Sequence, residues 1–134
     1  MKILRPWYWI AFATLFAVLD QASKAMIEIW LPLHNSIPVA VHFNLVHVLN
    51  PGAAFSFLAD QAGWQRLFLA GIAAFASVFL VVLIVRKPRF IEATAYSLIL
   101  GGAVGNLVDR IVRGAVVDWL DFYVNHWHWP AFNL

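Results

Sequence analysis

The sequence predicts an all-α transmembrane helical bundle with a small β segment outside the lipid, and three observations lead to this fold class. Apolar residues make up 63% of the chain and charged residues only 12%. A soluble domain carries roughly 25% charged residues, so this chain has too few charges to cover a water-facing surface. Long uncharged runs recur along the chain, and one segment between them alternates as a strand does. A chain of 134 residues is expected to form a single membrane-embedded domain, 1–134.

Net charge and cysteine content exclude several classes of function. The formal net charge is only +2 and no basic stripe occurs, so we expect no nucleic-acid partner. Cysteine is absent, which excludes disulfides, thiolate nucleophiles and cysteine-ligated metals together.

Three stretches are predicted to span a membrane, at about 6–27, 67–85 and 91–109. The middle stretch has 19 residues without a charge, close to the roughly 20 apolar residues that about 30 Å of hydrocarbon requires. It stops at an Arg-Lys-Pro-Arg turn, 86–89. The third stretch contains Gly101, Gly102 and Gly105, and such small residues let helices pack closely in lipid.

The segment 37–60 is predicted to form β structure. Apolar residues alternate through Val39, Val41, Phe43 and Leu45, which is strand periodicity. The alternation slips near His47, which predicts a β-bulge, and the Asn-Pro-Gly that follows is a turn signal.

The cations indicate how the chain is oriented in the membrane. Short loops obey the positive-inside rule best, and the loop 86–89 carries three cations. We therefore expect this loop and the N-terminus on the cytoplasmic side, and the β segment on the outer side.

Ionisable residues at membrane depth are costly and indicate function. Asp20 and Lys24 are four residues apart and share a helix face, as a structural ion pair or as a pair that orients other groups. Asp109 and Arg110 end the third span, either as interfacial caps or as site residues.

Asp118 and Asp121 follow a Val-Val pair and lie among aromatic residues. Apolar surroundings would raise the pKa of a carboxyl group, which could then exchange a proton near neutral pH. The alternative is a pair of solvated loop acids, and spacing alone favours that alternative.

His126 and His128 are spaced as on one face of a strand, but no His-Glu-x-x-His motif occurs. Histidines between tryptophans at an interface are more often part of an aromatic belt. We expect no metal and no other cofactor.

Five stretches together resemble the lipoprotein signal peptidase (signal peptidase II) family. They are DQASK at 20–24, NPGAAF at 50–55, GGAVGNLVDR at 101–110, GAVVD at 114–118 and WPAFN at 129–133. They occur in the family's order across nearly the whole chain. The resemblance implies a four-helix transmembrane bundle with a periplasmic β-cradle, in the bacterial inner membrane, with the active site facing the periplasm.

The activity implied by the resemblance is that of an aspartic endopeptidase. It would remove the signal peptide from prolipoproteins, just before a cysteine that carries diacylglycerol. The partners implied are these substrates and membrane lipids, and we expect a monomer.

The resemblance also implies roles for individual residues. Asp118 matches the family's first catalytic aspartate. Positions that line the family's site match Asn50, Gly52, Asn106, Arg110 and Asn133, and supporting positions match Asp20, Lys24 and Asp109.

One departure from the family pattern concerns the end of the chain. The family motif continues beyond the match to Asn133 to an alanine, a second catalytic aspartate and a fourth helix, whereas the sequence stops at Leu134. We therefore expect a truncated chain in which three of four helices are present, and expect that chain to be inactive.

Two other classes of protein remain as alternatives. A small proton or ion carrier would use Asp20, Lys24 and Asp109 as a relay, and would show ion flux without peptide cleavage. In a non-catalytic membrane subunit, single changes at Asn50, Asp118 or Arg110 would alter only stability.

Overall fold

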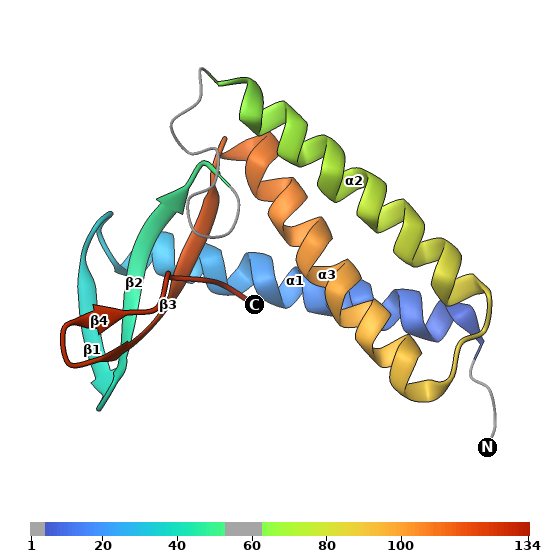
Figure 1. Cartoon of the computed structure of the whole chain (residues 1–134), viewed down its shortest axis with the longest axis horizontal. Helices are drawn as coiled ribbons and strands as arrows, with labels where there is room; N and C mark the ends of the chain where they lie inside the picture. Colours follow the sequence, from blue (N-terminus) through green and yellow to red (C-terminus); the bar gives the residue numbers. More distant parts are fainter. Residues whose placement is uncertain (1–4, 53–62) are drawn as a thin grey trace.

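Two long helices lie side by side, a third crosses them at an angle, and a small antiparallel sheet stands at one end, as Figure 1 shows for the computed structural model. The structure describes residues 5–52 and 63–134. Helix α1 covers Pro6–Trp30, α2 covers Trp64–Val85 and α3 covers Phe90–Val112. Each of the three is long and apolar enough to cross a membrane.

The helices run past the limits of the apolar stretches that predicted them. α1 continues to Trp30 instead of residue 27, α2 begins at Trp64 instead of residue 67, and α3 continues to Val112 instead of residue 109. Each of these extensions carries a charged residue, Glu28, Arg66 or Arg110, whose side chain binds a group on another segment. Arg66, for example, donates hydrogen bonds to the carbonyl oxygens of Arg110 and Ile111 at the end of α3. Carbonyl groups in the last turn of a helix have no backbone N–H donor within that helix, so these hydrogen bonds from Arg66 stabilise the end of α3 and join it to α2.

Helix α3 packs against both α1 and α2, which meet each other over much less of their length. At the crossing with α1, a Cβ atom on Gly101 would lie 2.8 Å from the carbonyl oxygen of Ala13 and 2.9 Å from Phe16. Glycine at this position therefore permits the close approach of the two helices. The buried apolar residues between the helices are Trp9, Ala13, Leu80, Ile84, Ala93 and Leu100.

Most of the apolar surface of the helices faces outward. Large side chains that are about half exposed or more include Leu15, Val18, Ile72, Phe75, Val78, Phe79 and Ile99. So much exposed apolar surface on long helices is expected in lipid and not in water. The chain is therefore a multi-pass membrane protein.

The sheet has four antiparallel strands in the order β1-β2-β3-β4. β1 is Ser36–Ala40, β2 is Phe43–Asn50, β3 is Val116–Val124 and β4 is Trp127–His128. The pairing of β2 with β3 shifts between Leu45 and Val48, which confirms the bulge predicted near His47. Residues 53–60 of the predicted β segment lie outside the described part of the chain.

Half of the sheet comes from a stretch for which no strand was predicted. β3 and β4 follow α3 after a turn at Gly114, where φ is +84°, a value that glycine adopts without strain. Through this turn β3 reaches β2, from which α2 and α3 separate it in sequence, and the pairing brings the two halves of the chain together.

Candidate active site

A groove of about 530 Å³ opens where β2 and β3 meet the end of α3 and the last residues of the chain. Its lining includes Asn50 and Gly52 after β2, Asn106 and Arg110 on α3, Asp118 on β3, and Asn133. The structure thus brings together the six residues that the resemblance marked as catalytic or substrate-binding. They come from four separate segments of the chain.

The carboxyl group of Asp118 is buried at the wall of this groove, and the residue is only 5% exposed. The side-chain amide of Asn50 donates to Oδ2 at 3.1 Å, and that of Asn133 donates to Oδ1 at 2.6 Å. Burial raises the pKa of Asp118 above its ordinary value, because desolvation disfavours the charged form. The two amide hydrogen bonds act in the opposite direction, since they stabilise the ionised form.

The turn after β2 fixes the amide group of Asn50. The backbone N–H of Gly52 donates to Asn50 Oδ1 at 3.0 Å, which leaves Nδ2 to donate to Asp118. The carbonyl of Gly52 in turn accepts from Arg110 Nη2 at 3.0 Å. The turn, the guanidinium and the carboxyl group therefore form one connected wall of the groove.

The side chain of Arg110 is buried and is hydrogen-bonded to the backbone of its own helix, α3. Its Nη1 donates to the backbone carbonyl of Asn106 at 3.3 Å. Its Nε is buried and has no acceptor among the described residues. A buried donor without an acceptor is costly.

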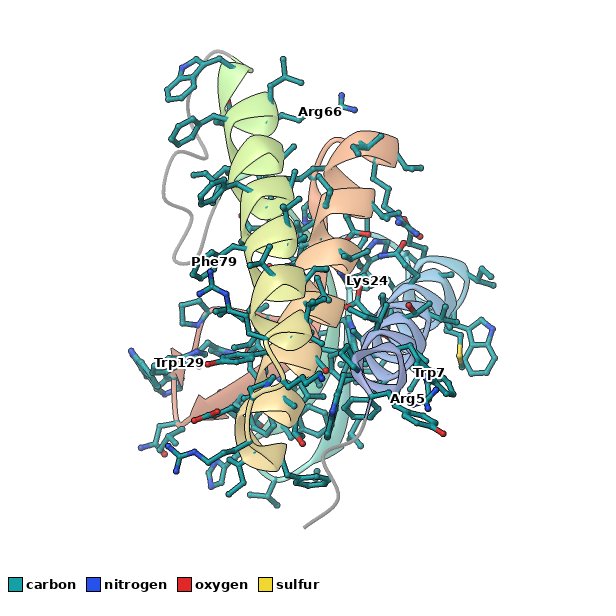
Figure 2. All side chains as sticks on the ribbon, turned by 90° about the vertical axis from the view of Figure 1, so that its right-hand side faces the viewer. Arg5, Trp7, Lys24, Arg66, Phe79 and Trp129 are labelled. Carbon is teal, nitrogen blue, oxygen red and sulfur yellow. The ribbon has the colours of Figure 1, made fainter. Side chains whose placement is uncertain are left out.

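Behind the groove lies a buried ionic network centred on Lys24, which Figure 2 shows between α1 and α3. Lys24 Nζ lies 2.8 Å from both Asp20 Oδ2 and Asp109 Oδ2, and the three side chains are fully buried. It also donates to Asn106 Oδ1 at 3.0 Å. Because Asn106 lines the groove, the network is joined directly to the site.

The network extends from the helices to the sheet through Asp109. Arg113 Nη1 lies 2.9 Å from Asp109 Oδ1, and Gln21 donates to the same oxygen at 2.8 Å. The backbone N–H of Val117 donates to Asp109 Oδ2 at 3.2 Å, one residue before Asp118. Asp20, Lys24 and Asp109 thus do not line the groove but hold the elements that do.

Asp121 is a further buried carboxylate that the sequence analysis singled out without giving it a role. It lies on β3, is 6% exposed, and contacts Asn44 and His128. The short spacing between Asp121 and His128 is the one signal in the sequence that could have suggested this contact.

The arrangement suits acid–base chemistry on a substrate in the groove. Asp118 offers a carboxyl group of raised pKa, and the surrounding amides bind without adding charge. In the described part of the chain it is the one acidic side chain that lines the groove. A mechanism with two carboxylates would need a second one from outside the described residues.

Comparison with known proteins shows which family the chain resembles. The family model of signal peptidase (SPase) II matches residues 12–134. The chain is 52% identical over 129 residues to the lipoprotein signal peptidase of Yersinia pestis (strain Pestoides F), and equally to that of Yersinia pseudotuberculosis (serotype O:1b, strain IP 31758). Each match covers 94% of this chain and 76% of the relative.

Solved structures of bacterial membrane enzymes share the fold. One has a TM-score of 0.81 at 28% identity and covers 94% of this chain and 76% of its own. Another has a TM-score of 0.81 at 26% identity and covers 94% of this chain and 81% of its own.

Proposed function

The chain belongs to the signal peptidase II family, whose members remove signal peptides from prolipoproteins, and on that premise we propose that Asp118 is a catalytic carboxylate of an aspartic protease. The observation that carries the proposal is the groove itself. It gathers Asp118 with Asn50, Gly52, Asn106, Arg110 and Asn133 from four segments. An ion carrier or a non-catalytic subunit would have no use for such a groove.

The proposed reaction needs a second carboxylate beside Asp118. Two close carboxyl groups cannot both ionise cheaply, so they share one proton and titrate as a pair. The ionised member takes a proton from a water, whose oxygen attacks the scissile carbonyl carbon, while the protonated member donates to the carbonyl oxygen. The tetrahedral intermediate then collapses, the C–N bond breaks, and the leaving nitrogen takes the proton.

We place this second carboxylate in the residues that follow Leu134 in the full family pattern. Asn133 already reaches Asp118 with a hydrogen bond of 2.6 Å. The family's aspartate would be three residues further on, and three extended residues span at most about 11 Å. The fourth helix of the family would follow, and we propose that the 134 residues without these elements show at most trace turnover.

The other groove residues are proposed to bind the substrate backbone. Asn50, Asn106 and Asn133 can donate and accept hydrogen bonds without adding charge near the reacting carboxyls. The guanidinium of Arg110, which lines the groove, is proposed to bind a carbonyl or lipid phosphate oxygen. Gly52 lets the peptide approach the backbone of the turn closely.

The diacylglyceryl chains on the substrate cysteine are proposed to remain among the helices. An apolar cavity of about 910 Å³ lies between α1, α2 and α3, lined by side chains such as Ile10, Val78 and Leu100. Its contents would exchange with lipid without crossing water.

We propose that the groove faces the periplasm and the membrane is the bacterial inner membrane. Figure 1 shows the start of α1 and the turn between α2 and α3 at the end of the molecule away from the sheet. That turn carries the cations of 86–89, which favour the cytoplasm. We also propose that the protein is a monomer.

The test is prolipoprotein cleavage in liposomes by the chain extended with the family's C-terminal segment. Asp118→Asn should lower the rate by at least about 100-fold, since positioned acid–base groups contribute 10²–10⁴-fold. Glu92→Gln is the matched control, because Glu92 binds the backbone N–H of Arg89 at the distant end of α3. Unreduced cleavage by Asp118→Asn would end the assignment.

A further inference from the structure

The last residues of the chain form a return limb that runs back along β3. After the β3–β4 hairpin, the backbone N–H of Trp129 donates to the carbonyl of Phe122 at 2.8 Å, and that of Phe132 donates to Leu120 at 3.1 Å. The limb then presents the Asn133 amide to Asp118. The position of Asn133 therefore depends on how firmly the limb is fixed to β3.

Asp121 is placed to fix the start of this limb. It is buried on β3, three residues after Asp118, and so on the opposite side of the strand from the groove. Its Oδ2 accepts a hydrogen bond of 2.8 Å from Asn44, its direct neighbour on β2. This contact fixes the carboxylate to the central strand pair.

His128, the last residue of β4, is the other partner of this carboxylate. Its Nδ1 lies 2.8 Å from Asp121 Oδ1 and 3.0 Å from Oδ2, within hydrogen-bonding distance of both oxygens. The imidazole also stacks on Tyr123, with ring centroids 5.1 Å apart. Asp121 thus joins three strands, because it binds Asn44 on β2 and His128 on β4 from its own place on β3.

We propose that Asp121 and His128 are positioning residues that hold the return limb on β3 so that the Asn133 amide reaches Asp118. This inference rests on the proposed function, since it takes Asp118 as the reacting carboxylate. Neither residue touches the groove, and neither is among its lining residues. Their effect on the reaction would pass through the limb to Asn133.

The proposal is tested by following the titration of Asp118, which responds to the Asn133 hydrogen bond. The ¹³C resonance of the Asp118 carboxyl is recorded against pH in the detergent-solubilised chain. Loss of a donor to the ionised form raises a carboxyl pKa. Asn133→Ala should therefore raise the pKa of Asp118, and this rise sets the scale for the other variants.

His128→Phe is the main variant, because the side chain is half exposed and phenylalanine keeps the stacking on Tyr123. It should raise the pKa of Asp118 by an amount comparable to Asn133→Ala. Asp121→Asn, which keeps the shape but can no longer accept from both Asn44 and His128, should do the same. Lys24 and Asp109, whose charges also act on Asp118, are unchanged in these variants.

The double variant His128→Phe with Asn133→Ala decides whether the effect passes through Asn133. A rise no larger than that of Asn133→Ala alone supports the proposal, because residues in one pathway are not additive. His126→Phe, on the exposed turn of the same hairpin, is the matched control and should leave the titration unchanged.

An unchanged Asp118 titration in a folded His128→Phe protein overturns the proposal, since the backbone hydrogen bonds alone would then hold Asn133. The proposal is also overturned if the rise in the pKa of Asp118 in the double variant equals the sum of the rises in the two single variants. The titration does not depend on proteolysis, so cleavage by Asp118→Asn would refute the catalytic assignment without altering this result.

Discussion

Two opposing effects act on the carboxyl group of Asp118. Burial at 5% exposure raises its pKa, and the amides of Asn50 and Asn133 partly offset this by binding both oxygens. Because the effect of burial is the larger of the two, ionisation of Asp118 lowers the stability of the folded state. A residue kept in this condition is typical of a functional site, where the local structure serves reactivity instead of stability.

The first prediction concerns the pH dependence of stability. Because the pKa of Asp118 is raised on folding, its contribution to stability is fully present below the ordinary value and is lost as pH rises through the raised value. The asparagine in the Asp118→Asn variant cannot ionise. Between the pKa of Asp118 in the unfolded chain and its raised pKa in the folded chain, the free energy of unfolding of the variant should therefore rise relative to that of the wild type by about 1.4 kcal/mol per pH unit. Thermal unfolding in detergent from pH 3.5 to 8 measures the difference.

The lost acceptor oxygen lowers the stability of Asp118→Asn by a constant amount at every pH. The prediction therefore concerns how the stability difference between variant and wild type changes with pH, and not its absolute size. A difference in melting temperature between variant and wild type that stays constant with pH would contradict it.

Spacing alone could not have identified the site residues. Asp118 and Asn133 are 15 positions apart and Asn50 is 68 positions away, so no local pattern relates the three. Hydropathy indicated only which acids lie near the lipid boundary. The resemblance named the groove residues, whereas the contact of Asp121 with His128 was found only in the structure.

At the scale of elements, the close crossing of α1 and α3 depends on Gly101. A Cβ atom there would meet the backbone oxygen of Ala13, which cannot move aside as a flexible side chain can. By contrast, a Cβ atom on Gly71 in α2 would have nothing within 4 Å. The two glycines therefore offer a matched pair in neighbouring helices.

The second prediction is that Gly101→Ala destabilises the protein by about 1–3 kcal/mol, as overpacking of a tight contact does. Gly71→Ala should be neutral or stabilising by up to about 1 kcal/mol, since alanine favours helix. Unfolding by denaturant in mixed micelles compares the two variants. Equal stabilities would show that α1 and α3 can separate without loss, contrary to the structure.

The helices could be predicted from the sequence, whereas half of the sheet could not. The three helices were predicted because an apolar run marks each of them, and length and composition are properties that are local in sequence. β3 was not predicted, although Val-Val-Asp-Trp-Leu-Asp-Phe-Tyr-Val is rich in strand formers. Its acids at 118 and 121 break the alternation, and its partner β2 lies about 70 residues earlier, so the strand is fixed by tertiary pairing.

At the scale of the whole molecule, the orientation in the membrane determines what the groove can reach. The absence of cysteine makes this orientation directly measurable, since any cysteine introduced is the only one. Pro88 lies in the turn between α2 and α3, and His126 lies in the hairpin beside the sheet. Replacing either residue leaves every lysine and arginine in place.

The third prediction is that His126→Cys reacts with a membrane-impermeant maleimide in intact spheroplasts, whereas Pro88→Cys reacts only after permeabilisation. The positive-inside rule places the cationic turn in the cytoplasm. The fraction of labelled protein on a gel measures the result. Labelling of Pro88→Cys in intact spheroplasts would reverse the proposed orientation.

The pairing of β2 with β3 also sets the order of events during synthesis. β2 leaves the ribosome early, but β3 follows only after α2 and α3 have been made. Until then one edge of β2 has no strand to bind, and such an edge is open to wrong pairing or to quality-control proteases. Because Asp118 lies on β3 and Asn50 follows β2, the groove cannot form until both strands have been made.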